Sequence, residues 1–211
     1  MRRLPVYLLI ETSGGMRGER IEAVKNGLQV LISKLRQDPF SLESVSISII
    51  TFAREPKQVL ALTDLESLQI PEIEIPESSP PHTGRALLFL NERLNNDLIK
   101  GTAEQKGDWR PLLFILTRGI PADKEDFRNA VSLIKARNFA SIVACSAGSH
   151  SSDLELKILT DNVVHLDTAD SSTLMSFFKW VSASIGAGNK SVSSTEEILL
   201  PPPPQEVHMV I

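Results

Sequence analysis

The sequence predicts an α/β fold with a doubly wound, mostly parallel six-stranded sheet, one short antiparallel edge strand, and helices on both faces. Two observations carry this prediction. The near-continuous apolar run from Val6 to Ile10 is typical of a central parallel strand that is buried on both faces. Further along the chain, apolar or β-branched runs alternate with amphipathic segments. The 211 residues, of which 42% are hydrophobic, are enough for one domain with a well-buried core.

The first half of the chain supplies the first three strands. After the initial strand, apolar residues at steps of three and four predict a helix over 17–37, which Pro39 ends. A β-branched run predicts a strand over 44–52, and a short turn joins it to a partner strand over 58–62. These two strands form the antiparallel hairpin. The proline-rich stretch 63–81 predicts a surface connector.

The second half repeats a helix–strand alternation, which favours helices on both faces of the sheet. A polar loop, GTAEQKGDW, precedes the strand at 112–116. The predicted helices cover 84–100, 123–137, 153–160 and 170–185, and the predicted strands cover 112–116, 139–147 and 162–166.

The composition changes after residue 186, so the sequence predicts a domain over 1–186 and a flexible proline-containing tail over 187–211. The stretch GAGNKSVSST is typical of a flexible linker, and the four prolines that follow favour polyproline II. Apolar patches at 198–200 and 207–211 flank the prolines. A docking segment, either for the domain itself or for a neighbouring molecule, is therefore the alternative.

Composition excludes several function classes. The net charge of −4, without a basic stripe, argues against nucleic-acid binding. No apolar run reaches the roughly 18 residues of a membrane span, and the start lacks a signal-peptide pattern, so we expect a cytoplasmic protein. Cys145 is the only cysteine and is expected to be a buried hydrophobe.

Motifs for chemistry are also missing. The four histidines, at positions 82, 150, 165 and 208, show no metal-ligand spacing, although His82 and His150 lie in loops expected at the ligand end of the sheet. No Gly-x-Ser-x-Gly elbow is present, and nothing indicates a catalytic nucleophile. We therefore expect no enzymatic activity and no cofactor. The oligomeric state is left open.

Four stretches identify a resemblance that covers most of residues 1–200. They resemble the von Willebrand factor A domain family, and within it the TerY-type proteins of bacterial tellurium-resistance and stress clusters. The resemblance implies a central first strand, and it implies protein partners that include a regulatory kinase or phosphatase. The stretches are RRLPVYLLIETSGGMRGE, IEAVKNGLQVLISKLRQDP, TAEQKGDWRPLLFILTRG and FFKWVSASI.

The resemblance implies a metal-ion-dependent adhesion site, but this sequence departs from it at most positions. In the family, an Asp-x-Ser-x-Ser motif, a later Thr and a final Asp hold Mg²⁺ or Mn²⁺, and a partner carboxylate completes the shell. Only the first serine is kept here, and Thr83 lies two residues from the family's Thr position. The corresponding residues are Glu11, Ser13, Gly15, Pro81 and Arg118.

These replacements predict that the metal is lost. Glu11 moves its carboxylate outward by one C–C bond, about 1.5 Å, and Mg²⁺ tolerates such shifts poorly. Gly15 and Pro81 offer no side-chain oxygen. Arg118 is always cationic and can only donate hydrogen bonds, so it repels a divalent ion. We expect a degenerate site without metal.

Two interpretations of Arg118 stay open, and they can coexist. In the structural one, its guanidinium pairs with Glu11 across adjacent strand ends and replaces the cation. In the functional one, it receives an Asp or Glu of a partner, with Arg17 and Arg85 beside it. The candidate partner-binding residues are Ser13, Arg118, Arg17, His82, Thr83 and Arg85.

The sequence thus predicts a non-catalytic, metal-independent protein–protein interaction module in a bacterial tellurium-resistance or stress-response system. One alternative is an adhesion domain that retains weak Mg²⁺ or Mn²⁺ binding through Glu11, Ser13 and Thr83. A second is a small-anion or nucleotide binder, in which residues 12–15 cradle a phosphate at a helix N-terminus. The phosphate-binding glycine motifs themselves are missing.

Overall fold

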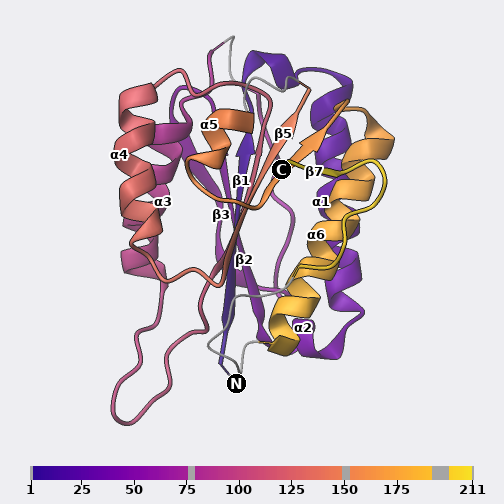
Figure 1. Cartoon of the computed structure of the whole chain (residues 1–211). Coiled ribbons are helices and arrows are strands. Elements are labelled where there is room, and N and C mark those ends of the chain that lie inside the picture. The colour runs from indigo at the N-terminus through magenta and orange to yellow at the C-terminus, as the bar shows by residue number, and fades with distance from the viewer. Residues whose placement is uncertain (1, 76–78, 149–152, 192–199, 211) are drawn as a thin grey trace.

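The computed structural model describes residues 2–75, 79–148, 153–191 and 200–210, and within them seven strands form one sheet in the order β3-β2-β1-β4-β5-β6-β7 (Figure 1). The pairs β2–β1, β1–β4, β4–β5 and β5–β6 are parallel. Antiparallel strands close both edges, β3 beside β2 and β7 beside β6. The strands are β1 (Leu4–Glu11), β2 (Val45–Phe52), β3 (Pro56–Asp64), β4 (Leu112–Thr117), β5 (Ser141–Ala147), β6 (Val163–Leu166) and β7 (His208–Met209).

Helices cover both faces of the sheet, as expected. Helices α1, α2 and α6 pack on one face, and α3, α4 and α5 pack on the other (Figure 1). Their bounds are α1 (Glu19–Arg36), α2 (Pro39–Ser44), α3 (Thr83–Asp97), α4 (Lys124–Lys135), α5 (Asp153–Lys157) and α6 (Ser171–Ser191), and a 3-10 turn η1 (Gly14–Met16) precedes α1. The doubly wound α/β architecture is therefore confirmed.

Strand β1 is central and divides the core into two halves. All eight of its residues are buried. Leu8 and Ile10 face the α1–α6 side, whereas Tyr7 and Leu9 face the α3–α4 side. This alternation follows from the period of two along a strand. Because each fully buried aliphatic side chain contributes about 1.5–3 kcal/mol, β1 anchors the site at its carboxyl end firmly.

Two helices differ from the prediction. Pro39, expected only to end the first helix, also begins α2. Proline fits a first helical position because the amide hydrogen that it lacks would have had no partner there, and Ser41 Oγ donates to Asp38 just before it (2.7 Å). Helix α6 continues past Ile185 to Ser191, through residues expected to be linker.

The sheet also has one strand more than expected, and this strand comes from the C-terminal segment. The sequence left open whether that segment docks on the domain. Its described part, residues 200–210, lies against the domain, and its two-residue strand β7 pairs with β6.

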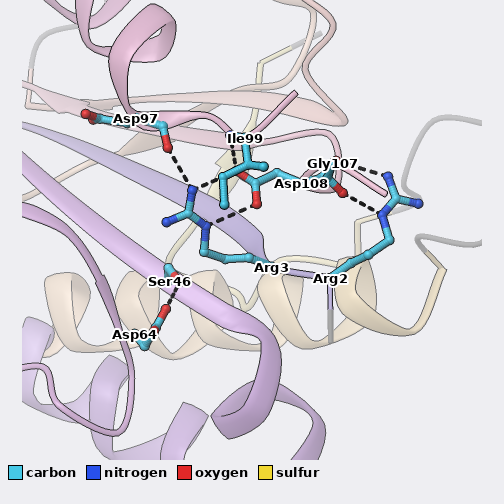
Figure 2. Close-up of polar contacts among 8 residues, drawn as sticks. All are labelled: Arg2, Arg3, Ser46, Asp64, Asp97, Ile99, Gly107 and Asp108. Atoms are coloured by element: carbon cyan, nitrogen blue, oxygen red, sulfur yellow. Dashed lines mark hydrogen bonds and ion pairs between the residues drawn. The ribbon is translucent and has the colours of Figure 1, made fainter. Parts of the chain in front are cut away.

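A long polar loop joins α3 to β4, and two N-terminal arginines hold its base (Figure 2). Arg3 donates to both carboxylate oxygens of Asp108 (Nε–Oδ1 3.1 Å, Nη2–Oδ2 2.7 Å) and to the Asp97 carbonyl (2.7 Å). Arg2 lies over the Trp109 ring, with its Cζ atom 3.5 Å from the centroid. The loop is thus tied to the start of β1, at the end of the sheet opposite to Arg118.

None of the helices in the described part of the chain is long and apolar enough to cross a bilayer.

Candidate interaction site at the carboxyl ends of β1 and β4

The site lies where β1 and β4 end side by side. The two strands are parallel neighbours, with Ile10 in register with Leu116. In sheets of this kind ligands sit at the carboxyl ends of the strands. The chain after β1 turns through η1 into α1, and the chain after β4 turns at Arg118 and Gly119. The topology therefore brings both predicted halves of the site together.

Glu11 is buried, and its carboxylate is satisfied by groups of the fold itself. The residue is 2% exposed. Its Oε1 accepts a hydrogen bond from Ser13 Oγ, and its Oε2 accepts from Thr117 Oγ1 (2.5 Å) and from the backbone N–H of Arg118 (2.7 Å). Three donors on two oxygens compensate for the burial of this acidic group without any cation.

The Arg118 guanidinium occupies the space of the second serine of the family motif. Its Nη1 donates to the Gly15 carbonyl oxygen (2.7 Å). A Cβ atom added at Gly15 would lie only 2.7 Å from the same Nη1. A side chain at position 15 and this position of the guanidinium therefore exclude each other.

The expected ion pair between the side chains of Glu11 and Arg118 is not formed among the described residues. The physical reason is local. The amide of Arg118 already points at the Glu11 carboxylate, and two nearby hydroxyls complete its hydrogen bonds. The Arg118 side chain instead extends across the turn to Gly15. Glu11 is held by hydrogen bonds, and the arginine charge is left for other partners.

The other edge of the Arg118 guanidinium carries no hydrogen bond to any described residue. Its Nε is buried and has no partner, and this Nε–Nη2 edge faces Gly148. A Cβ atom added at Gly148 would lie 3.6 Å from Nη2 and 3.9 Å from Nε. Nε is therefore closed to an incoming group, and a partner reaches the guanidinium through the part that lines the cleft.

This guanidinium opens onto a cleft of about 540 Å³ with charges of both signs. Arg20 lies in the same cleft and also donates to the Gly15 carbonyl (3.1 Å), so two guanidinium groups converge on one carbonyl. The cleft residues are Arg17, Glu19, Arg20, Arg118, Gly148, Asp167, Thr168, Ala169 and Asp170.

Asp170 lies in the acidic wall of this cleft, but its oxygens are already engaged. The hydroxyl of Thr168, the backbone N–H of Thr173 and the hydroxyl of Ser172 hold the pKa of its carboxyl well below its usual range. These bonds cap the start of α6. Asp170 is therefore a fixed anion of the fold.

The loop before α3 borders the site but turns its polar groups inward. Pro81 contacts the strand end after β4, since its carbonyl accepts from Ala122 (2.9 Å) and a Cβ at Gly119 would lie 3.0 Å from its ring. His82 Nδ1 and the Thr83 hydroxyl are buried without hydrogen-bond partners, and Thr83 is fully buried. The Thr83 side chain is therefore not presented to a partner surface, whereas His82 is half-buried and only its Nδ1 is hidden.

Arg85 is not joined to Arg118 by any contact among the described residues. Its Nη1 pairs with Glu55, and its Nε lies 3.7 Å from Asp126. His150, the other loop histidine, lies outside the described residues. Of the predicted partner-binding residues, the structure thus groups Ser13, Arg17 and Arg118 around one turn.

The residues at this site do not fit a divalent ion. Magnesium needs about six oxygen ligands in near-ideal octahedral geometry. Glu11 is the only acidic residue among the motif positions, and both of its oxygens are in use. The described chain holds no group of three or more His, Cys, Asp or Glu residues arranged for a metal. The guanidinium lies where an ion's ligand would be.

Sequence reasoning did not find a second polar cluster, which joins β5, α5 and β6. The Ser146 hydroxyl bonds Asp153 and lies 2.9 Å from His165 Nδ1, and all three residues are buried. The residue types match a hydrolase triad, but Ser146 is fully buried and no substrate can reach its hydroxyl. The spacing in the sequence gave no signal, because the three residues come from separate elements.

Comparison with known proteins places this geometry in a family. The sequence matches the profile of the von Willebrand factor type A domain over residues 6–179. No curated protein matched the sequence. Among solved structures, proximal thread matrix protein 1 from the mussel byssus is similar, with a TM-score of 0.65 at 13% identity over 86% of this chain and 48% of that one.

Two further structures are similar in fold. A von Willebrand factor type A protein from Catenulispora acidiphila has a TM-score of 0.64 at 16% identity, covering 88% of this chain and 43% of the other. The SpRpn10 VWA domain has a TM-score of 0.55 at 15% identity, covering 84% and 94%. The chain spans about half the length of the first structures it resembles. By its profile match and its fold, the chain belongs to the von Willebrand factor type A domain family.

Proposed function

We propose that this chain is a non-catalytic, metal-independent protein-interaction module in which Arg118 receives a carboxylate of a protein partner. Domains of this family are commonly protein-interaction modules. In the family's usual arrangement, a partner carboxylate completes the shell of a bound cation. Here a fixed guanidinium would take over the role of that cation.

One observation carries the proposal. The Arg118 guanidinium is held at Gly15 by one nitrogen, lines the cleft, and pairs with no carboxylate among the described residues. A carboxylate that enters the cleft can pair with this guanidinium by a charge-assisted hydrogen bond. Because the Nη1 bond already fixes the side chain, little rotamer entropy is lost on binding.

Charge argues against a retained cation. Two unit charges 4 Å apart interact by about 4 kcal/mol at an effective dielectric constant of 20, and a divalent ion doubles this repulsion with Arg118. Glu11 is the only anionic group among the motif positions, and its oxygens already accept three hydrogen bonds. Weak metal-dependent adhesion through Glu11, Ser13 and Thr83 is disfavoured further because the Thr83 hydroxyl is fully buried.

The biological setting rests on the resemblance to TerY-type proteins. We place the chain in the cytoplasm, in a bacterial tellurium-resistance or stress-response assembly, with a regulatory kinase or phosphatase of the same cluster as the first partner to test. The interaction module itself comprises residues 1–186, with 187–211 as an attached segment. This assignment predicts that the partner presents an exposed Asp or Glu.

Calorimetric titration tests metal independence. We expect no saturable heat with Mg²⁺ or Mn²⁺ for the wild-type chain. The matched control combines Glu11→Asp, Gly15→Ser, Pro81→Thr and Arg118→Asp, which rebuilds the family's ligand set and should give saturable heat. Saturable binding to the wild type that Arg118→Asp strengthens would instead establish the metal-dependent alternative.

Copurification from the native host tests the role of Arg118. A tagged wild-type chain should retain its partners with and without chelator, whereas Arg118→Ala should lose them. Arg20→Ala is the control, because it removes the other guanidinium at Gly15 and leaves the Arg118 guanidinium in place. Equal recovery with all three chains would contradict the proposal.

Small-anion binding is a second candidate, because three arginines line the cleft. Glu19, Asp167 and Asp170 in the same cleft oppose it. A thermal-shift panel of inorganic phosphate and nucleotides separates the two functions. Stabilisation by phosphate that Arg118→Ala abolishes would favour the anion.

A further inference from the structure

The C-terminal segment, defined as residues 200–210, runs along the outside of the domain. It crosses α6 and returns to the sheet edge beside β6 (Figure 1). Its first proline is held through the backbone, since Trp180 Nε1 donates to the Pro201 carbonyl (2.8 Å). Further along, Val207 is 2% exposed and packs in the core formed with α1 and α6.

The domain meets this segment with three features that together form a peptide groove. Trp180 offers an indole donor, and the core offers a socket for Val207. The third feature is the edge of β6, where Val164 pairs with Met209 and the Val210 N–H donates to the Val163 carbonyl (2.9 Å). Strand addition to a sheet edge, with an aromatic contact to prolines, is a recurring mode of peptide recognition.

The segment fills this groove incompletely. A cavity of about 490 Å³ lies beneath the prolines, between them and the starts of β5 and β6. Ser141 lines it, and the Ser141 hydroxyl is buried without a hydrogen-bond partner. Lys135 lies at the rim of the same cavity. Surface around an unfilled cavity lacks contacts on one side, so an occupant that fills the space beneath the prolines has contacts to gain.

The segment is also attached weakly for its length. Strand β7 has only two residues, and both are exposed. The four prolines have no N–H groups and contribute acceptors only. Its main anchors are one indole hydrogen bond, one buried valine and a short ladder. Such elements open locally at a lower free energy than the core does.

We propose that the surface formed by Trp180, the Val207 socket and the β6 edge is a peptide-binding groove, and that the C-terminal segment is its exchangeable occupant within the chain. The partner is an extended proline-containing segment of another protein that ends in a short apolar strand. An acidic side chain on that segment would complement Lys135 at the rim and fill the cavity beneath the prolines. The groove is separate from the Arg118 cleft and does not depend on it.

A peptide supplied in trans tests the groove. The probe is a fluorescein-labelled peptide of residues 200–210, LPPPPQEVHMV, followed by anisotropy with the full chain. Val207→Asp in the full chain should release its own segment, because the socket does not accept a charge. We expect saturable binding to this variant, at least tenfold tighter than to the wild type. In the wild type, the tethered segment competes at an effective concentration of about 1 mM.

Further variants make the result specific. Val210→Pro removes the N–H donor to β6 without touching the buried socket, and it should also open the groove. Adding Trp180→Phe to that variant should weaken the peptide at least tenfold by removing the indole donor. A labelled peptide in which Val207 is replaced by Asp is the negative control.

Three outcomes would overturn the proposal. The first is no saturable binding to either variant while circular dichroism shows both to be folded. The second is failure of both variants to fold, which would make the segment an integral part of the core. The third concerns hydrogen exchange in the wild type. If the Val207 and Val210 amides exchange as slowly as the Leu113 amide in β4, the segment opens only with global unfolding and is not exchangeable.

Discussion

Two arginines at opposite ends of the sheet use the same functional group differently. Arg3, at the start of β1, meets both oxygens of Asp108 and the Asp97 carbonyl (Figure 2). Arg118, at the end of β4, meets one carbonyl, and no carboxylate pairs with it among the described residues. The Arg3 donors are largely used within the fold, whereas the positive charge of Arg118 has no carboxylate partner among the described residues.

The difference indicates how a structural arginine can be told from one that serves binding. Asp108 is a good acceptor because its side chain is only 5% exposed and its Oδ2 also accepts the Ile99 N–H (2.8 Å). Its hydrogen bonds with Arg3, and then its charge, raise the pKa of Arg3. Glu11 is equally buried but takes its hydrogen bonds from Ser13, Thr117 and a backbone amide. Whether a buried carboxylate pairs with a nearby guanidinium therefore depends on the other hydrogen-bond donors around it.

The largest expected effect is at the Arg3 end. Asp108→Ala leaves Arg3 and the Ile99 amide without their acceptor, so it should lower the free energy of unfolding by about 3 kcal/mol. Urea denaturation measures this change. Glu104→Ala, in the exposed part of the same loop, is the matched control and should change stability by less than about 0.5 kcal/mol. Equal effects of the two substitutions would show that the loop base is not a structural anchor.

A smaller loss is expected where Glu11 is held. Thr117→Val removes one hydroxyl donor from a buried carboxylate at nearly constant volume, so we expect a loss of about 2 kcal/mol. Thr12→Val is the matched control, since the Thr12 hydroxyl reaches only the Phe52 carbonyl at 3.4 Å. If both variants are equally stable, the Glu11 network contributes little and the comparison with Asp108 fails.

Tyr7, buried near the Arg3 end, gives a pH-dependent test. Burial, followed by the charge of Asp97, raises the pKa of the Tyr7 phenol above its usual value of 10.0. Above about pH 10 the unfolded chain releases the phenol proton of Tyr7, whereas the native chain retains it. The stabilisation from Tyr7 is therefore complete below about pH 10 and falls as the pH rises. At about pH 11, the free energy of unfolding should be lower by about 1.4 kcal/mol.

The measurement is direct because Tyr7 is the only tyrosine in the chain. Phenolate absorbance at 295 nm should appear together with alkaline unfolding, and Tyr7→Phe should reduce the slope of stability against pH above pH 10. Titration of Tyr7 near pH 10 in the folded protein would contradict the burial argument.

The sequence predicted the frame of the site but not its bonding. Apolar runs and the family resemblance placed Glu11 and Gly15 at the end of the first strand and Arg118 at the end of the strand over 112–116. Parallel neighbouring strands bring these two carboxyl ends together. The Glu11–Arg118 pair was not formed, because the direction of the Arg118 amide depends on how the chain turns after β4. No residue pattern encodes that direction.

Short elements were beyond the sequence for related reasons. Two-residue β7 is too short for any periodic signal, and it depends on the burial of Val207 against elements distant in the sequence. The proline at position 39 both ends one helix and begins the next, so its signal was ambiguous. The loop after α3 was predicted as polar, but its anchoring to Arg3 depends on long-range contacts.

The smallest expected effect on stability is at Arg118 itself. Arg118→Ala removes one hydrogen bond to Gly15 but keeps the backbone N–H that donates to Glu11, so the loss should stay at or below about 1 kcal/mol. Arg118→Pro, the matched control, also removes that N–H and should cost more. Because Arg118→Ala removes the guanidinium and keeps the backbone N–H, a loss of partner binding without a loss of stability would assign the guanidinium to recognition. A loss of stability as large as that of Asp108→Ala would make Arg118 a structural residue like Arg3.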